Sequence, residues 1–119
     1  MSYDIDLNDP ITGNVIEFDT PHQLRGGTYR VGGSNNASLN ITYNYSRFYY
    51  NVLDEDKGIR AIYGMTGADS IPVLEAAISL LGDDVSEDYW DATEGNAKSA
   101  LLKLVALAKM RPDGVWMGD

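Results

Sequence analysis

The residues best suited to chemistry in this chain are tyrosines and asparagines gathered in one short segment. Four of the eight tyrosines lie between positions 43 and 50, interleaved with amide and hydroxyl side chains. A phenol ring offers a flat apolar face and a polar tip, and this combination suits recognition of a partner. Because no catalytic pattern accompanies the cluster, residues 40–50 are predicted to bind and not to catalyse.

A second aromatic pair, Tyr89 and Trp90, stands in an acidic stretch before the last predicted helix. We expect residues 40–50 and the turn at 89–96 to form one binding face. Amides and hydroxyls would read the polar edges of a ligand, rings would stack on it, and an arginine would take a phosphate. The predicted ligand-binding residues are Asn40, Thr42, Tyr43, Asn44, Tyr45, Tyr89, Trp90, Thr93, Asn96, Arg25, Arg30 and Arg47.

Patterns for catalysis are weaker than the pattern for binding. His22 is the single histidine, and no spacing ties a nucleophile or an orienting group to it. Asp91 and Glu94 would have to sit beside the tyrosines in a pocket to act as acid and base. We predict no catalytic residues and no cofactor. A small hydrolase or lyase acting on a nucleotide-like substrate remains the alternative, together with a minor virion or assembly component.

Metal and phosphate sites are not favoured by the spacing of acids and glycines. The acidic start at 4–9 resembles a calcium loop, but an EF-hand needs Gly and Glu where this chain has Asp9 and Val15. Alternation along a strand explains the same acids, so no metal is predicted. The glycine pairs at 26–27 and 32–33 lack the spacing of a phosphate loop. They bracket a short strand and could line a ligand site between them.

Composition narrows the possible partners. The net charge of −9 disfavours direct binding to the nucleic-acid backbone, and the acidic surface serves either solubility or docking on a basic partner. The chain has no cysteine, no apolar run that approaches ~20 residues and no basic start followed by an apolar stretch. We therefore expect a protein of the cytoplasm without membrane contact. Homo-oligomer formation is left open.

Residue periodicity predicts strands first and helices afterwards. Strands are expected as a hairpin over 3–18 and at 28–31 and 37–42, and helices at 46–53, 59–65, 69–81 and 93–110. Asp69 or Ser70 should cap the third helix, because Pro72 fits only near a helix start, and Thr93 should cap the last. The tail should pack Trp116 on the body. This order indicates a single α+β domain over 1–119, mainly β in 3–42 and mainly α in 44–110, with a small N-terminal antiparallel sheet against about three C-terminal helices.

Longer motifs carry a resemblance to a known family. They are GGTY at 26–29 with LNITYNYS at 39–46, IPVLEAAI at 71–78, and YWDATEGNA at 89–97 with RPDGVW at 111–116. Over nearly its full length the chain resembles a family of small accessory proteins of tailed phages and prophages of gut bacteria, although Arg47 stands where close relatives should have Pro. The resemblance implies a non-enzymatic binder in the host cytoplasm. It would act against host defence or regulation by blocking a host protein or sequestering a nucleotide-type signal.

Overall fold

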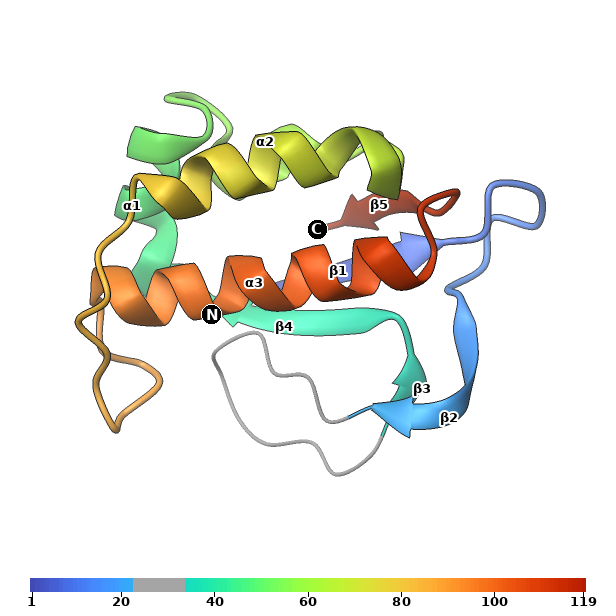
Figure 1. Cartoon of the computed structure of the whole chain (residues 1–119), viewed down its shortest axis with the longest axis horizontal. Coiled ribbons are helices and arrows are strands. Elements are labelled where there is room, and N and C mark those ends of the chain that lie inside the picture. The colour runs from blue at the N-terminus through green and yellow to red at the C-terminus, as the bar shows by residue number, and fades with distance from the viewer. Residues whose placement is uncertain (23–33) are drawn as a thin grey trace.

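An antiparallel three-stranded sheet carries two long helices on one face (Figure 1). The computed structural model describes residues 1–22 and 34–119, and all statements below concern these residues. The central strand, β1 (Ser2–Asn8), lies between β4 (Ser38–Thr42) and β5 (Val115–Gly118). Helices α2 (Gly67–Ser79) and α3 (Glu94–Met110) pack side by side. The predicted α+β class, with the helices mostly in the C-terminal part, is confirmed.

Strict alternation gives β1 one apolar and one polar face. Tyr3, Ile5 and Leu7 are buried in the core, whereas Asp4 and Asp6 point to the opposite side of the strand. On that outer face the acids contact β4. The Asn40 Nδ2 donates to Asp4 Oδ1 at 2.5 Å, and the Ser38 Oγ donates to Asp6 Oδ1 at 2.6 Å. Asn40, predicted to bind a ligand, therefore lies on the outer face of the sheet.

Short helices close the end of the sheet at which β4 finishes. The 3-10 turn η1 (Tyr43–Tyr45) follows β4 directly and runs into α1 (Ser46–Val52), and η2 (Gly58–Ile62) packs on α1. The Thr42 hydroxyl caps η1 by accepting from the Asn44 N–H at 3.2 Å. The predicted helix at 46–53 is confirmed to within one residue.

The caps of the two long helices show one success and one error of prediction. Thr93 caps α3 as predicted and accepts from the Asn96 N–H at 3.1 Å. The cap of α2 is Thr66, which accepts from the Asp69 N–H at 3.1 Å, so the predicted caps Asp69 and Ser70 are wrong. Pro72 consequently lies inside α2. The helix forms in spite of this proline because its apolar side is buried in the core.

The predicted hairpin over 3–18 is wrong. Strand β2 (Glu17–His22) pairs with β3 (Ser34–Asn36) in a separate two-stranded sheet, and β1 pairs with β4 and β5. Only an isolated bridge between Asn8 and Val15 joins the two predicted arms. The loop expected from Pro21 onward begins later, since β2 includes Pro21 and His22. The predicted strand at 28–31, together with Arg25 and Arg30, lies outside the described residues.

The C-terminal tail forms the third strand of the sheet, which the sequence analysis did not foresee. Strand β5 pairs with β1 in antiparallel register and brings Trp116 opposite Leu7. Trp116 is fully buried, as predicted, and its Nε1 donates to the Ser70 Oγ of α2 at 2.8 Å. Ser70 in turn donates to the Gly67 carbonyl at 2.8 Å. This chain of hydrogen bonds ties β5 to the first turns of α2.

Replacing Ser70 by Ala should lower the free energy of unfolding by ~1–3 kcal/mol, because the buried Trp116 N–H loses its acceptor. Chemical denaturation measures the loss. Ser79→Ala is the matched control, since Ser79 is an exposed serine of α2 that also donates to the carbonyl three residues earlier. Equal stability of the two variants would contradict the role assigned to Ser70.

Candidate functional site

The two segments predicted to form one face do meet, at the end of the molecule where α1 lies (Figure 1). The irregular connector between α2 and α3 (residues 80–93, called the connector below) lies against η1 and α1. Asn44 Nδ2 donates to the Trp90 carbonyl at 2.7 Å, and the Tyr45 hydroxyl donates to the Tyr89 carbonyl. Arg47 Nη2 donates to a third connector carbonyl, that of Ala92, at 3.3 Å.

Residues at the start of α3 hold the connector from the other side. Asn96, almost fully buried, donates from Nδ2 to the carbonyls of Asp88 and Asp91 at 3.2 and 3.1 Å. Its Oδ1 accepts from the Ser86 N–H at 3.2 Å. Close approach is possible because Gly95 has no side chain: a Cβ there would lie 2.7–2.8 Å from backbone atoms of residues 83 and 84. The connector is thus a fixed loop.

The predicted site residues fall into two groups. The structure brings together around the connector Asn44, Tyr45, Arg47, Tyr89, Trp90, Thr93 and Asn96. Tyr43 lies away from the connector, because its ring packs edge-on against Tyr3 with centroids 4.5 Å apart and the Arg60 guanidinium stands over both rings. Asn40 and Thr42 serve the sheet and the cap described above. Hydrogen bonds within the chain thus engage most of the predicted polar groups.

Tyr89 and Trp90 are the predicted aromatic residues that face solvent, and of the other described members Asn44 and Arg47 are exposed as well. Tyr89 and Trp90 are 40% and 50% exposed, and their rings meet edge to face with centroids 5.1 Å apart and an angle of 86° between the ring planes. Their backbone carbonyls are the acceptors for Tyr45 and Asn44. The main chain is therefore anchored at the same two residues that present exposed rings.

A hollow of about 150 Å³ opens beside this pair. Its walls come from the connector, from η1 and from one side of α3. The lining residues are Tyr45, Ser86, Glu87, Tyr89, Asn96, Ser99 and Ala100. Ser86, Glu87, Ser99 and Ala100 were missed by the sequence analysis. Helical spacing could have pointed to Ser99 and Ala100, since both lie one turn beyond Asn96.

The connector and the first residue of α3 are strongly acidic. Between positions 83 and 94 there are six Asp or Glu residues and no Lys or Arg. Asp83 pairs with Lys98 at 2.6 Å, Asp91 accepts from the Ser86 hydroxyl at 2.6 Å, and Glu94 accepts from a backbone N–H. The carboxylates of Glu87 and Asp88 have no ion pair or hydrogen bond within the part of the chain that the structure describes. These two acids immediately precede the exposed rings.

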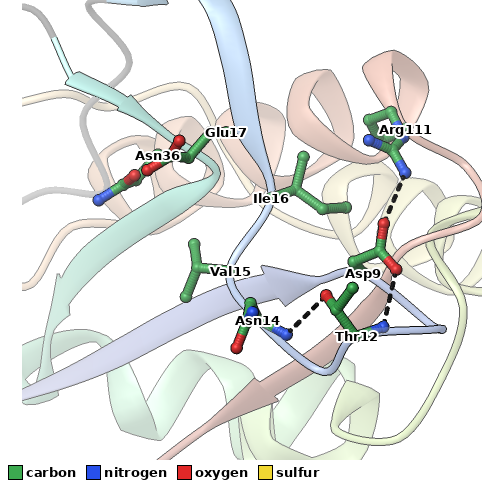
Figure 2. A pocket seen from close by; sticks show the side chains of 8 residues that line it. All are labelled: Asp9, Thr12, Asn14, Val15, Ile16, Glu17, Asn36 and Arg111. Carbon is green, nitrogen blue, oxygen red and sulfur yellow. Dashed lines mark hydrogen bonds and ion pairs between the residues drawn. The ribbon is translucent and has the colours of Figure 1, made fainter.

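A larger hollow of about 620 Å³ lies near the first turn of the chain (Figure 2). Asp9 stands there between the Arg111 guanidinium, at 3.5 Å, and the N–H groups of Ile11 and Thr12. Arg111 also holds Asp113 through two hydrogen bonds of 2.9 and 2.8 Å. Backbone hydrogen bonds from Thr12 and Ile11 lower the pKa of Asp9. The charges of Asp9 and Arg111 are thus paired with each other, whereas Glu17, which also lines the hollow, makes no ion pair within the described residues. None of the predicted site residues that the structure describes lines this hollow.

Burial raises the pKa values of two tyrosines at this end of the molecule, Tyr45 and Tyr49. It raises the pKa of Tyr45 to about 12, and the negative charge of Asp91 adds to the effect. Burial also raises the pKa of Tyr49, whose hydroxyl donates to the Ala97 carbonyl of α3 at 2.9 Å. Both phenols are therefore neutral donors at physiological pH.

Comparison with protein-family models, with curated proteins and with solved structures gives no match. Among the described residues no three His, Cys, Asp or Glu side chains gather as a metal would require. Within the same residues no helix combines the length and the apolar character that crossing a bilayer needs.

Raising the pH from about 10 to about 12 should destabilise the protein in part through Tyr45. Its phenol ionises near pH 10 in the unfolded chain and near 12 in the folded one, so the stabilisation is intact below 10 and is lost as the pH climbs through 12. Tyr45→Phe should lower stability at neutral pH by ~1 kcal/mol and flatten the alkaline loss. Urea unfolding at several pH values measures both. Parallel curves for the two proteins would contradict the assignment.

Proposed function

We propose that this chain is a binding protein that docks on a basic surface of another protein through the connector. One observation carries the proposal: Tyr89 and Trp90 are exposed while their own backbone carbonyls are held by Asn44 and Tyr45. Tyrosine and tryptophan are enriched among the residues that dominate binding energy at protein interfaces.

The fixed backbone supports docking on energetic grounds. A loop that must be ordered on binding loses conformational entropy, and this loss weakens the complex. Here Asn96 and the donors of α1 and η1 already order the loop in the free protein. The edge-to-face contact limits the motion of the two rings as well. Little ordering is left for the moment of association.

Charge complementarity supports a basic partner. Six of the chain's eighteen Asp and Glu residues, and none of its nine Lys and Arg residues, lie between positions 83 and 94, so the negative charge is concentrated around the exposed rings. Such a surface attracts a positive partner over long range and speeds association at low salt. A host protein that acts in defence or regulation is the partner we propose, on the strength of the resemblance to phage accessory proteins. The host cytoplasm is then the place of action.

A nucleotide-type ligand is less well supported. Asn44, Thr93 and Asn96, which were predicted to read its polar edges, make hydrogen bonds within the chain. The adjoining hollow of about 150 Å³ is smaller than the ~300–1,000 Å³ of usual small-molecule pockets. The carboxylates considered for catalysis, Asp91 and Glu94, also accept hydrogen bonds within the chain.

Trp90→Ala should weaken binding to a partner captured from host extract and then purified by at least tenfold, as expected for an aromatic anchor. Titration calorimetry at low and high salt measures the affinity, which should fall steeply with salt because the acidic surface is exposed. Ile11→Ala is the control: Ile11 is an exposed apolar side chain in the loop between β1 and β2, and this loop lies at the opposite end of the molecule from the connector (Figure 1). Salt-insensitive binding, or equal affinity of both variants, would sink the proposal.

The stability of Trp90→Ala should stay close to that of the unaltered protein, because Trp90 is half exposed and the substitution keeps the backbone carbonyl that accepts from Asn44. Thermal unfolding checks this. The same assay tests the nucleotide alternative, since a ligand at a hundred times its Kd stabilises a protein by ~2.7 kcal/mol. A thermal shift of that size with any cyclic or linear nucleotide would favour the alternative.

A further inference from the structure

We infer that the hollow beside Tyr89 receives one lysine or arginine side chain of the partner. This inference rests on the proposed docking of the connector and specifies which chemical group of the partner binds in the hollow. The hollow measures about 150 Å³, the room of about five water molecules, and so suits a single extended side chain.

The lining of the hollow matches a long cationic side chain along its length. Tyr89 provides apolar surface for an aliphatic stem, and Tyr45 and Ala100 also line the hollow but are each only 1% exposed. Glu87 and the hydroxyl group of Ser99 provide oxygen acceptors for a positively charged head, whereas the Ser86 hydroxyl already accepts from the Asp88 N–H at 3.2 Å and donates to Asp91. The exposed face of Tyr89 also attracts a cation. An acidic or purely apolar side chain would leave one of these sets unmatched.

Glu87 is the acid available to such a head group. Asp83, Asp91 and Glu94 are already engaged by Lys98, by the Ser86 hydroxyl and by a backbone N–H. Glu87 lines the hollow, and its carboxylate has no ion pair or hydrogen bond within residues 1–22 and 34–119. An incoming cation would form the ion pair that the Glu87 carboxylate lacks within the described residues.

Among the described residues, the positive groups near this end of the molecule are engaged elsewhere or lie outside the lining of the hollow. Lys98 binds Asp83 at 2.6 Å, and Arg47 donates to the Ala92 carbonyl while its guanidinium lies 4.8 Å from the Phe48 ring centroid. Lys103 lies one helical turn beyond Ser99 and Ala100 on α3. The positive charge of Lys103 repels an incoming cation. Neutralising Lys103 should therefore strengthen binding of the cation, whereas neutralising Glu87 should weaken it.

Amide NMR spectra of the whole chain, recorded during titration with N-acetyl-arginine amide and with N-acetyl-lysine amide, test the inference. We expect saturable shifts at residues 86–89 and 99–100 for at least one of the two, and the stronger binder identifies the head group. The citrulline analogue, which keeps the shape of arginine without its charge, should bind much more weakly. Equal shifts with citrulline, or no shifts at these residues with either cation, would overturn the inference.

Charge variants make the test directional. Glu87→Gln should weaken binding of the amino-acid amide about threefold to fivefold, and Lys103→Gln should tighten it, as expected for exposed charges. Ser99→Leu should abolish binding by filling the hollow at an exposed helix position. Glu55→Gln is the matched control for charge, since Glu55 is an exposed acid of the loop after α1. Unchanged affinity in Glu87→Gln would count against the inference.

Failure of this inference can be told apart from failure of the docking proposal. If Trp90→Ala abolishes partner binding while neither amide shifts the hollow, docking stands and the cationic side chain is refuted. If an amide binds at the hollow but Trp90→Ala binds the partner as the unaltered protein does, the docking proposal falls. The inference then falls with it.

Discussion

Hydrogen bonds from elsewhere in the chain hold the backbone of the connector, and they shape the whole end of the molecule. A segment without helix or strand has few donors of its own for its carbonyls, and in the connector these are the N–H groups of Asp91 and Thr93. Asn44, Tyr45 and Arg47 supply donors from one side, and Asn96 supplies them from the other. Asn44 and Tyr45, two members of the aromatic and amide cluster in the sequence, therefore help to hold a loop.

The same hydrogen bonds explain how a structural feature becomes a surface for binding. Donors that reach the carbonyls of Tyr89 and Trp90 hold the main chain while both rings remain exposed. Some of the acids around these rings have partners within the chain: Asp83, Asp91 and Glu94 bind a lysine, a serine hydroxyl and a backbone N–H. The carboxylates of Glu87 and Asp88 have no such partner among the described residues and are exposed to solvent. A rigid backbone, exposed aromatic rings and carboxylates without partners among the described residues thus lie at one place, and the proposed docking depends on all three.

Elements governed by neighbours in the sequence were predictable. Alternating residues in β1 and β4, the helical spacing of α3 and its Thr93 cap depend on contacts within a few residues. The partners of β1 were not predictable in this way, because β4 and β5 lie far away along the chain and the turn after Asn8 made a hairpin look favourable. The start of α2 was misplaced for a related reason: burial of its apolar side outweighs the local cost of Pro72.

For the candidate site, residue types alone indicated a tyrosine- and asparagine-rich cluster, an acidic stretch and their pairing in one face. Composition and local spacing are enough to predict these three features, because they show which side chains are present and how far apart they lie along the chain. The sequence does not show which polar groups form hydrogen bonds within the chain, as those of Asn44, Tyr45 and Asn96 do. It also does not show which side chains stay exposed, as those of Tyr89, Trp90 and Glu87 do. Both depend on the folded structure. Hydrogen-bond partners and exposure arise from contacts between segments distant in sequence, and only the packed chain brings those segments together.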